Sequence, residues 1–256
     1  MQYISNIAVF IPTLNRPSKL KLTLKNISEQ IYKPKEVYVI DNDKQGSNRN
    51  VVEEHNCQFN TDYQYIKYNE DLGPYDSKNY AIKKTNCEYL AFHDDDDIWL
   101  DNYLKIFSEI HQLKNADIYI SEYTVVNENL EKIFDFYIPE KFKLNDIYIW
   151  NPGILSSNII IKKKIFDLIG GYDPKVSGSA DKDLLIKIIN NNYKYFVIKE
   201  RLMLYVTHAE QWTKNYKMIY HQSKLFFNKY KNQMNNITKL RFYKKLLMLF
   251  LKSIAK

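Results

Sequence analysis

Short apolar runs recur along the first hundred residues at intervals that leave room for helices. The runs are Ile7–Ile11, Val37–Ile40 and Glu88–Phe92, with a weaker one at Tyr63–Ile66. Apolar runs of this length are typical of strands that are buried on both faces of a parallel sheet. We therefore predict four strands in this part of the chain.

Segments between these runs show helical spacing. Pro17 suits the first turn of a helix, because proline lacks an N–H group that would be unpaired there. The apolar residues that would share one side of this helix are Leu20, Leu24, Ile27 and Ile31. A second helix is predicted over residues 79–84. A third is predicted by the spacing of Leu100, Leu104, Phe107 and Ile110. Strand–helix alternation predicts an α/β fold, whose ligands bind beyond the carboxyl ends of the parallel strands.

The second half of the chain has a mixed pattern. Residues 183–189 are predicted to be helical, and several other segments are predicted to be extended. These segments are Ile118–Val126, Ile133–Ile138, Asn158–Ile161, Tyr193–Ile198 and Leu202–Val206. The first two are spaced to pair as antiparallel strands. We expect one α/β body over residues 1–212 and a helical extension over residues 213–256.

The charge is distributed unevenly. The 256 residues include 37 Lys or Arg and 30 Asp or Glu, for a net charge of +7 at pH 7. Residues 211–256 contain 11 of the basic residues and no acidic residue, so the first 210 residues hold 26 basic against 30 acidic residues. A basic tail of this kind suits an anionic surface, either lipid headgroups or nucleic acid.

Composition also bears on location. Two cysteines cannot form a disulfide framework and fit a reducing compartment. The first residues lack a positive n-region, so we expect no signal peptide. No run reaches the roughly 18 apolar residues of a membrane span. We therefore expect a cytoplasmic protein. The basic tail also allows peripheral attachment to the inner face of the cytoplasmic membrane.

The tail has an amphipathic pattern that fits two interpretations. Apolar residues on one helical face are Leu240, Tyr243, Leu247, Phe250, Leu251 and Ile254. Basic residues on another face are Arg241, Lys245, Lys252 and Lys256. Such a helix suits the interface of an anionic bilayer. The alternative is a terminal helix whose apolar face packs on the body.

Four consecutive aspartates, 94–97, follow a predicted buried strand. Adjacent carboxylates repel unless a cation neutralises them. In an extended segment, Asp94 and Asp96 would face one way and Asp95 and Asp97 the other. One pair would then hold Mg²⁺ or Mn²⁺ together with a diphosphate and water. The alternative is a solvated acidic turn that caps a helix beginning near Trp99.

Three other polar groups follow predicted strands or loops. Asp41 and Asn42 end a strand and suit a nucleobase or ribose, or else an ordinary Asx turn. Asp181 follows a Gly/Ser-rich loop and suits a general base, whereas Asp183 is nearer the helix body; both could instead cap the helix. His208 follows the last predicted strand and suits a metal or a leaving diphosphate, although a single histidine is often structural.

Six stretches, taken in order, resemble family 2 glycosyltransferases of the GT-A fold. They are residues 9–16, 34–42, 72–79, 88–97, 170–173 and 180–184. The likeness spans residues 4–212. It implies a three-layer α/β/α sandwich with a mostly parallel nucleotide-binding sheet, mixed strands on the acceptor side and a basic helical tail. Residues 1–98 would form the nucleotide-sugar-binding half and residues 99–212 the acceptor-binding half.

The resemblance also implies an activity. It implies metal-dependent, inverting transfer of one sugar from a nucleotide-sugar, expected to be a UDP-sugar, to a hydroxyl group of a glycan or a lipid-linked acceptor. This chemistry belongs to the assembly of bacterial surface polysaccharide or lipooligosaccharide, and the cofactor would be Mn²⁺ or Mg²⁺.

Site roles follow from the same resemblance. Asp181 matches the general base. Asp94 and Asp96 match the ends of the D-x-D motif, with Asp96 and His208 nearest the metal. The nucleotide-sugar contacts would be Pro12, Thr13, Asn15, Asp41, Asn42, Lys78, Asp94 and Asp95. Trp150 is a candidate sugar-stacking platform or a core residue, and Asp183 is a second acceptor-side candidate.

Two positions and one missing motif depart from the family pattern. Ala180 replaces the usual Glu before the base, and Lys78 replaces an Arg, which keeps the charge but loses the bidentate fork. The Q-x-x-R-W motif of processive members is missing, so we expect single additions.

Two competing functions remain. A nucleotidyltransferase would also use strand-end aspartates and a metal, but it usually needs a glycine-rich, basic phosphate loop that residues 11–15 do not provide. A nucleic-acid-binding protein would use the basic tail. The acidic body opposes that function, because its carboxylates repel phosphate, so we expect no nucleic-acid partner.

Overall fold

Strand β1 (Ile4–Thr13) is the centre of the first half of the sheet, and its residues Ile7–Ile11 have no exposed surface. In the computed structural model, which describes residues 4–43, 45–68, 73–208 and 215–254, successive side chains of β1 enter two different clusters. Ala8 and Phe10 belong to one cluster, whereas Ile7, Val9 and Ile11 belong to the other. This alternation is that of a strand covered on both faces.

The first half forms a parallel sheet. Strand β1 pairs in parallel with β2 and β4, and β2 pairs in parallel with β3. The bounds are β2 (Lys33–Asp41), β3 (Gln64–Lys67) and β4 (Tyr89–Phe92). The connecting helices are α1 (Pro17–Ser28), α2 (Arg49–Phe59) and α3 (Pro74–Ile82). The carboxyl ends of β1, β2 and β4 therefore meet at one edge of the sheet.

The second half extends the sheet with strands of both directions. The order is β3-β2-β1-β4-β8-β6-β9-β5, with β7 also paired to β6. Strand β8 runs antiparallel between β4 and β6, while β6 and β9 are parallel. The bounds are β5 (Ile98–Trp99), β6 (Ile118–Val126), β7 (Lys132–Phe136), β8 (Ile159–Lys162) and β9 (Tyr195–Val206).

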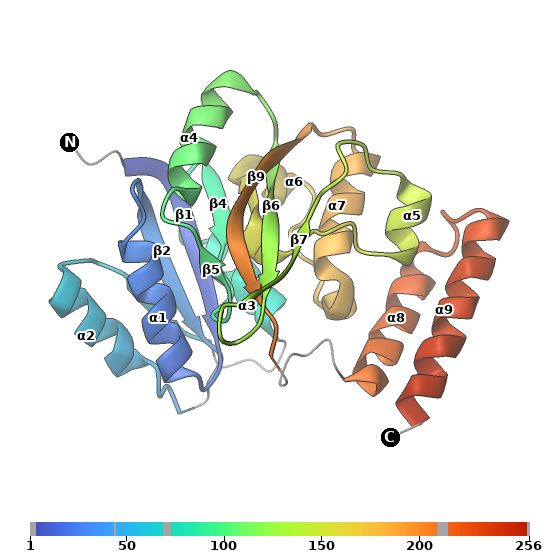
Figure 1. Ribbon diagram of the computed structural model, residues 1–256, viewed down its shortest axis with the longest axis horizontal. Coiled ribbons are helices and arrows are strands. Elements are labelled where there is room, and N and C mark those ends of the chain that lie inside the picture. Colours follow the sequence, from blue (N-terminus) through green and yellow to red (C-terminus); the bar gives the residue numbers. More distant parts are fainter. Residues whose placement is uncertain (1–3, 44, 69–72, 209–214, 255–256) are drawn as a thin grey trace.

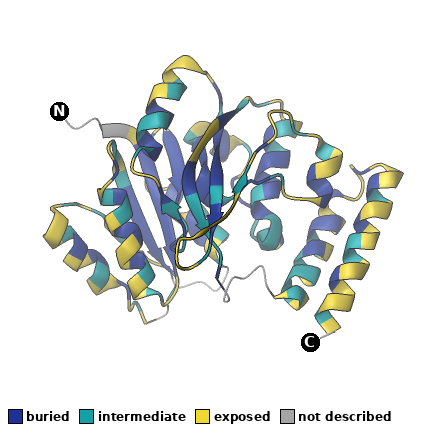
Figure 2. Ribbon diagram, in the orientation of Figure 1, coloured by how far each residue is buried: buried dark blue, intermediate teal, exposed yellow. Residues whose placement is uncertain are grey.

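Helices cover both faces, which gives the expected three layers. One apolar cluster contains buried residues of α1, α2 and α4, and the other those of α3, α6 and α7. The strands are accordingly buried throughout the centre, as Figure 2 shows. The bounds are α4 (Tyr103–Leu113), α5 (Leu144–Ile149), η1 (Ser156–Asn158), α6 (Lys163–Leu168), η2 (Pro174–Ser179) and α7 (Ala180–Asn190).

The basic tail forms two helices that pack on the body. Helices α8 (Tyr216–Tyr230) and α9 (Asn236–Ile254) lie side by side at the end remote from α2 (Figure 1). They join the main core through Phe226, Phe227 and Phe242. Tyr148 of α5 hydrogen-bonds Gln233 between the two helices. Among the described residues, no helix combines the length and apolarity needed to cross a bilayer.

The apolar face of α9 identified from the sequence is not the face that packs. Phe242 and Leu249 are buried against the body. The predicted face stays exposed, with 42–61% of each side chain accessible, and consists of Leu240, Tyr243, Leu247, Phe250, Leu251 and Ile254. Tyr243 and Phe250 contact the rings of Phe227 and Tyr220 in α8. Packing therefore accounts for only part of this face, and the outer side of α9 is largely exposed in Figure 2.

Several local expectations were wrong. Ile31 lies beyond the end of α1 and is 47% exposed. Leu100 precedes α4, because residues 98–99 form β5 where a helix start was expected. Residues 193–198 and 202–206 belong largely to one strand, β9, rather than two. Helix α2 was not predicted, since it buries only Val52 and His55.

Candidate active site

The four aspartates form a turn at the carboxyl end of β4. The backbone N–H of Asp97 donates to the carbonyl of Asp94 at 3.2 Å, which closes the turn. The expected alternation of an extended segment was therefore wrong. Asp95 and Asp96, which are adjacent in sequence, both accept from the guanidinium group of Arg16, at 3.0 and 3.3 Å. Thr13 donates to Asp95 at 2.8 Å from the end of β1.

A buried network fixes this turn from behind. The side chain of Asn26 in α1 bonds the backbone N–H and carbonyl of Trp99, at 3.0 and 2.8 Å. His93 contacts Asn26 and packs on the ring of Trp99. Burial lowers the pKa of His93 to about 4, so this ring is neutral at physiological pH. The turn is therefore held on both sides before any ligand binds.

One hydrogen-bonded chain joins the aspartate turn to Asp181. Lys78 in α3 lies 2.9 Å from the carboxylate of Asp94 and 2.9 Å from the hydroxyl of Ser156. Ser156 donates to Asp181 at 3.2 Å, and Tyr75 donates to the other oxygen of Asp181 at 3.3 Å. The two clusters of carboxylates that the sequence predicted separately thus share one cavity of about 790 Å³.

Asp181 has the properties of a base. It lies in the first turn of α7, at the end of the η2 loop, and lines the cavity. Burial raises the pKa of Asp181 to about 7, and the nearby ammonium of Lys78 opposes that rise. A carboxylate with a pKa near the working pH can take a proton from a hydroxyl group and release it again.

The donor atoms of the turn fit a hard divalent cation that a substrate helps to bind. Asp94, Asp95, Asp96 and Asp97 all line the cavity, and in the described part of the chain the buried Oδ1 atom of Asp97 has no hydrogen-bond partner. His208 lies 2.9 Å from Asp96. Within the described ranges, no three His, Cys, Asp or Glu side chains are grouped closely enough to hold a metal alone. Mg²⁺ is commonly held by one or two carboxylates plus substrate phosphates, so Asp96 suits that arrangement, with His208 beside it.

The end of β2 forms an Asx turn, which was one of the two alternatives predicted for Asp41 and Asn42. Asp41 is fully buried and accepts from Asp43, Asn48 and Tyr65. Its oxygens are therefore committed to the protein. Asn42 lines the cavity, and its buried Oδ1 atom has no hydrogen-bond partner among the residues that the structure describes. Of this pair, Asn42 has the free acceptor that a nucleobase would use.

Some of the other residues predicted to contact the nucleotide-sugar line the cavity, and one does not. Pro12, Thr13 and Lys78 line the cavity. Asn15 is exposed, has a positive φ of 52° and shapes the turn after β1 without lining the cavity. Asparagine tolerates this left-handed conformation better than most residues.

The two acceptor-side candidates lie in different settings. Trp150 is 55% exposed, so it is not a core residue, and the ammonium of Lys245 lies 5.2 Å from its ring centre. Asp183 is fully buried, pairs with Lys187 at 3.0 Å and accepts from Tyr230 at 2.6 Å. Neither residue lines the cavity, although Asn151, next to Trp150, does.

Three residues of the site were not assigned a role from the sequence. Arg16 follows the end of β1, where its position beside the ligand edge of the sheet gave a usable signal. Tyr75 and Ser156 contact Asp181 from α3 and η1. Their contacts depend on tertiary packing, and no sequence pattern marks them.

A further contact joins two of the six stretches that resemble the family, residues 72–79 and 170–173. Asn79 of α3 donates to the carbonyl of Tyr172 at 2.8 Å and accepts from its N–H at 3.0 Å. Gly171, just before it, has φ of 63°, and a Cβ there would lie 2.7 Å from the side-chain oxygen of Asn79. Glycine is thus required where the loop before η2 meets α3.

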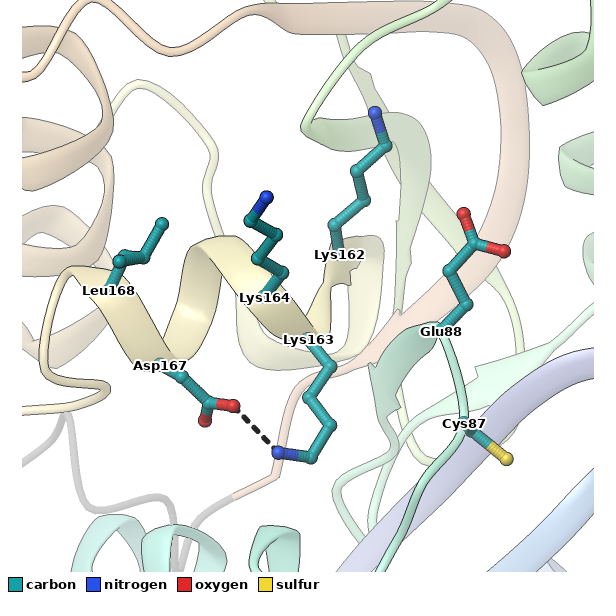
Figure 3. A pocket seen from close by; sticks show the side chains of 7 residues that line it. All are labelled: Cys87, Glu88, Lys162, Lys163, Lys164, Asp167 and Leu168. Carbon is teal, nitrogen blue, oxygen red and sulfur yellow. Dashed lines mark hydrogen bonds and ion pairs between the residues drawn. The ribbon is translucent and has the colours of Figure 1, made fainter.

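A second hollow, of about 730 Å³, lies at the opposite end of β4 (Figure 3). Its lysines have ordinary partners: Lys163 pairs with Asp167 at 2.6 Å, and Lys162 with Asp117 at 3.3 Å. Figure 3 shows Lys164 pointing away from the Lys163–Asp167 pair. Nothing in this hollow resembles the connected carboxylates of the first cavity.

Solved structures with the same fold are glycosyltransferases. A Staphylococcus aureus TarS fragment, residues 1–349, in complex with UDP-GlcNAc aligns with 96% of this chain and 72% of its own, with a TM-score of 0.68 and 18% identity. The Pyrobaculum calidifontis mannosyltransferase PcManGT, in complex with GDP-Man and Mn²⁺, aligns with 90% of this chain and 65% of its own, with a TM-score of 0.67 and 17% identity. These likenesses confirm the GT-A fold.

Sequence relatives point the same way. An uncharacterized glycosyltransferase of Methanocaldococcus jannaschii is 30% identical over 205 residues, covering 78% of this chain and 70% of the relative. The Escherichia coli enzyme WfgD, named as a UDP-Glc:alpha-D-GlcNAc-diphosphoundecaprenol beta-1,3-glucosyltransferase, is 23% identical over 63% of this chain and 62% of its own. Residues 8–170 match the family described as Glycosyl transferase family 2. The chain thus belongs to glycosyl transferase family 2 and is a glycosyltransferase.

Proposed function

We propose that the protein transfers one sugar from a UDP-sugar to a hydroxyl group of a lipid-linked glycan, with inversion at the anomeric carbon and with Mn²⁺ or Mg²⁺. The observation that carries this proposal is the raised pKa of Asp181 in the same cavity as the aspartate turn. A base and a diphosphate-binding group in one cavity are what transfer from a nucleotide-sugar requires.

Asp181 acts on the acceptor. Its carboxylate takes the proton of the acceptor hydroxyl as that oxygen forms a bond to the anomeric carbon. The bond from this carbon to the nucleoside diphosphate breaks on the opposite side, which inverts the configuration. Ser156 and Tyr75, which donate to Asp181, hold the carboxylate in place.

The donor lies across the ends of β1, β2 and β4. Thr13, Asn42 and Asp95 are placed for the nucleoside, because Asn42 has a free acceptor and Thr13 orients Asp95. Lys78 and Asp96 are placed for the diphosphate. A divalent cation bound at Asp96 and His208 would neutralise charge on the leaving diphosphate. Arg16, which bonds Asp95 and Asp96, supplies further positive charge to this region.

A lipid-linked acceptor is supported by two kinds of observation. Two relatives are named for lipid-linked substrates: the Escherichia coli enzyme and a Campylobacter jejuni GalNAc(5)-diNAcBac-PP-undecaprenol beta-1,3-glucosyltransferase, which is 31% identical over 36% of this chain and 29% of its own. The exposed apolar face of α9 is flanked by Arg241 and Lys252, and the tail has no acidic residue. We therefore include peripheral attachment to an anionic, cytoplasmic membrane surface in the proposal.

The test is calorimetric binding of UDP, followed by a screen of UDP-sugars for hydrolysis. UDP is expected to bind with Mn²⁺ and to lose at least tenfold in affinity with EDTA or in Asp96→Ala. Lys244→Met, a change at an exposed tail lysine, serves as the matched control. Equal affinity in EDTA would contradict the metal requirement, and a preference for GDP-sugars would contradict the UDP assignment.

A further inference from the structure

Two lysines in the cavity wall lack an anionic partner. Lys182 follows Asp181 in α7, and Lys245 reaches the cavity from α9. Lys182 is only 5% exposed, and its ammonium lies 4.0 Å from the ring centre of Phe226. Among the described residues, neither ammonium forms an ion pair with a carboxylate, although both belong to a cavity that is open to substrate.

Nearby carboxylates are already engaged by other groups. Asp183 pairs with Lys187 and Lys229. Asp146 pairs with Arg241 at 3.1 Å. Asp181 accepts hydrogen bonds from Ser156 and Tyr75, as described above. Lys182 and Lys245 are consequently left as the uncompensated positive charges of this wall.

Hydrogen bonds satisfy the two ammonium groups only in part. Lys182 lies 3.4 Å from the carbonyl of Tyr148, and Lys245 lies 2.5 Å from that of Ile149, both in the last turn of α5. An ammonium group has three N–H donors, so each lysine has donors to spare. Burial lowers the pKa of Lys245 to about 8, and burial together with the charge of Lys245 lowers that of Lys182. An anion bound between the two ammonium groups would compensate their buried positive charge.

We propose that Lys182 and Lys245 bind the diphosphate of an acceptor in which the accepting sugar is attached directly to that diphosphate. This inference rests on the proposed function and names the chemistry of its acceptor. Asp181, Lys182 and Lys245 all line the same cavity, so a sugar whose hydroxyl reaches Asp181 can have its phosphorylated end at the two lysines. Ammonium groups bind phosphate well as compact charges.

The position of the pair separates it from the donor's phosphates. The donor side of the cavity is formed by the turn after β1, Lys78 of α3 and the aspartates after β4. Lys182 lies instead against the ring of Phe226 in α8, and Lys245 lies against the ring of Trp150 after α5. The two lysines thus contact other elements than the donor-side groups do.

The test is calorimetry with hexyl diphosphate in EDTA, where the donor's phosphate site lacks its metal. The wild-type protein is expected to bind this probe, and Lys182→Met and Lys245→Met are each expected to lose tenfold or more in affinity. Lys244→Met, on the same helix as Lys245 but exposed, is the matched control and is expected to bind like the wild type. Inorganic pyrophosphate, tested in parallel, shows whether a free diphosphate suffices or the alkyl link adds affinity.

Each outcome decides the inference. Unchanged affinity for hexyl diphosphate in both Met variants would overturn it. A loss of stability without a loss of this affinity would also overturn it, because the lysines would then serve only to cap α5. Methionine is apolar and similar in length, so removing a buried charge is expected to preserve the fold. Binding of UDP with Mn²⁺ is measured separately: if it persists while hexyl diphosphate fails to bind, the acceptor inference falls and the proposed transferase stands.

Discussion

Lys78 and Asp181 share one neighbour, the hydroxyl group of Ser156, which lies 2.9 Å from the ammonium and donates to the carboxylate at 3.2 Å. The donor side and the base are therefore linked by a single side chain. The charge of Lys78 lowers the pKa of Asp181 against the larger effect of burial. The protonation state of the base thus depends on a residue that also contacts Asp94.

Lys78→Met is expected to move the acidic limb of the pH–rate profile to higher pH. Removing the ammonium leaves burial and the charge of Asp94, both of which raise the pKa of Asp181. The limb is read from kcat/KM measured between pH 5 and 9. Lys78→Arg keeps the charge and is expected to keep the limb near its wild-type position. An unchanged limb in the Met variant would show that Lys78 does not act on the base.

Asp181→Asn is expected to lower kcat by roughly 10²-fold or more, because the amide cannot accept the proton. Since the pKa of Asp181 is about 7, wild-type activity should fall as the pH drops below 7 and the base becomes protonated. UDP affinity, measured by calorimetry, should stay within a few-fold. Wild-type turnover in Asp181→Asn would assign the proton transfer to another group.

Gly171→Ala is expected to destabilise the protein by about 1–3 kcal/mol, because the position combines a positive φ with a close approach. An added Cβ would lie 2.7 Å from Asn79 and 2.9 Å from Phe166. Gly170→Ala is the control: φ is also positive there, but no atom lies within 4 Å of the added Cβ. Urea unfolding of both variants gives the part of the lost stability that is due to the close contact. An equal loss of unfolding free energy in the two variants would show that the contact has no cost.

The unmodified chain of residues 1–256 is expected to sediment with anionic vesicles, and less so at high salt, because basic residues near a charged bilayer contribute about 1 kcal/mol each. Replacing Leu247 and Leu251 by Gln removes exposed apolar side chains without touching the buried residues Phe242 and Leu249. This double variant should remain in the supernatant. If the wild-type protein also remains there at low salt, α9 has no membrane role.

Some features of the fold could be predicted from the sequence because they depend on local pattern. The buried strand β1 and the position of the four aspartates directly after β4 needed only an apolar run and its polar end, whereas the turn that the aspartates form was not the favoured expectation. Helix α2 was not predicted because it has few apolar residues. Strand β9 was predicted as two strands because polar residues interrupt its apolar run at 199–201. A pattern also cannot say which apolar face of α9 is buried, since both faces are apolar.

The candidate site was predictable in its residue types and less so in its contacts. Asp181 and the aspartate turn were found from their places after strands and loops. The pairing of His208 with Asp96, which are 112 residues apart, was only a family expectation until the fold brought them together. Ser156 links Lys78 to Asp181 because β8 is inserted next to β4, and a reversed strand inserted into a parallel sheet leaves no local signal.

Helices α8 and α9 form part of the cavity wall through Met218, Gln222 and Lys245, and they lie outside residues 8–170 that match the family. Under the proposed function, part of the surface that faces the acceptor is thus encoded in a stretch of the gene separate from the proposed donor-binding strands. Mutations there would then accumulate without altering the nucleotide chemistry. A lineage could in this way retain one donor while changing the molecule that it decorates, and exchanging residues 215–254 between relatives would reproduce that change in the laboratory.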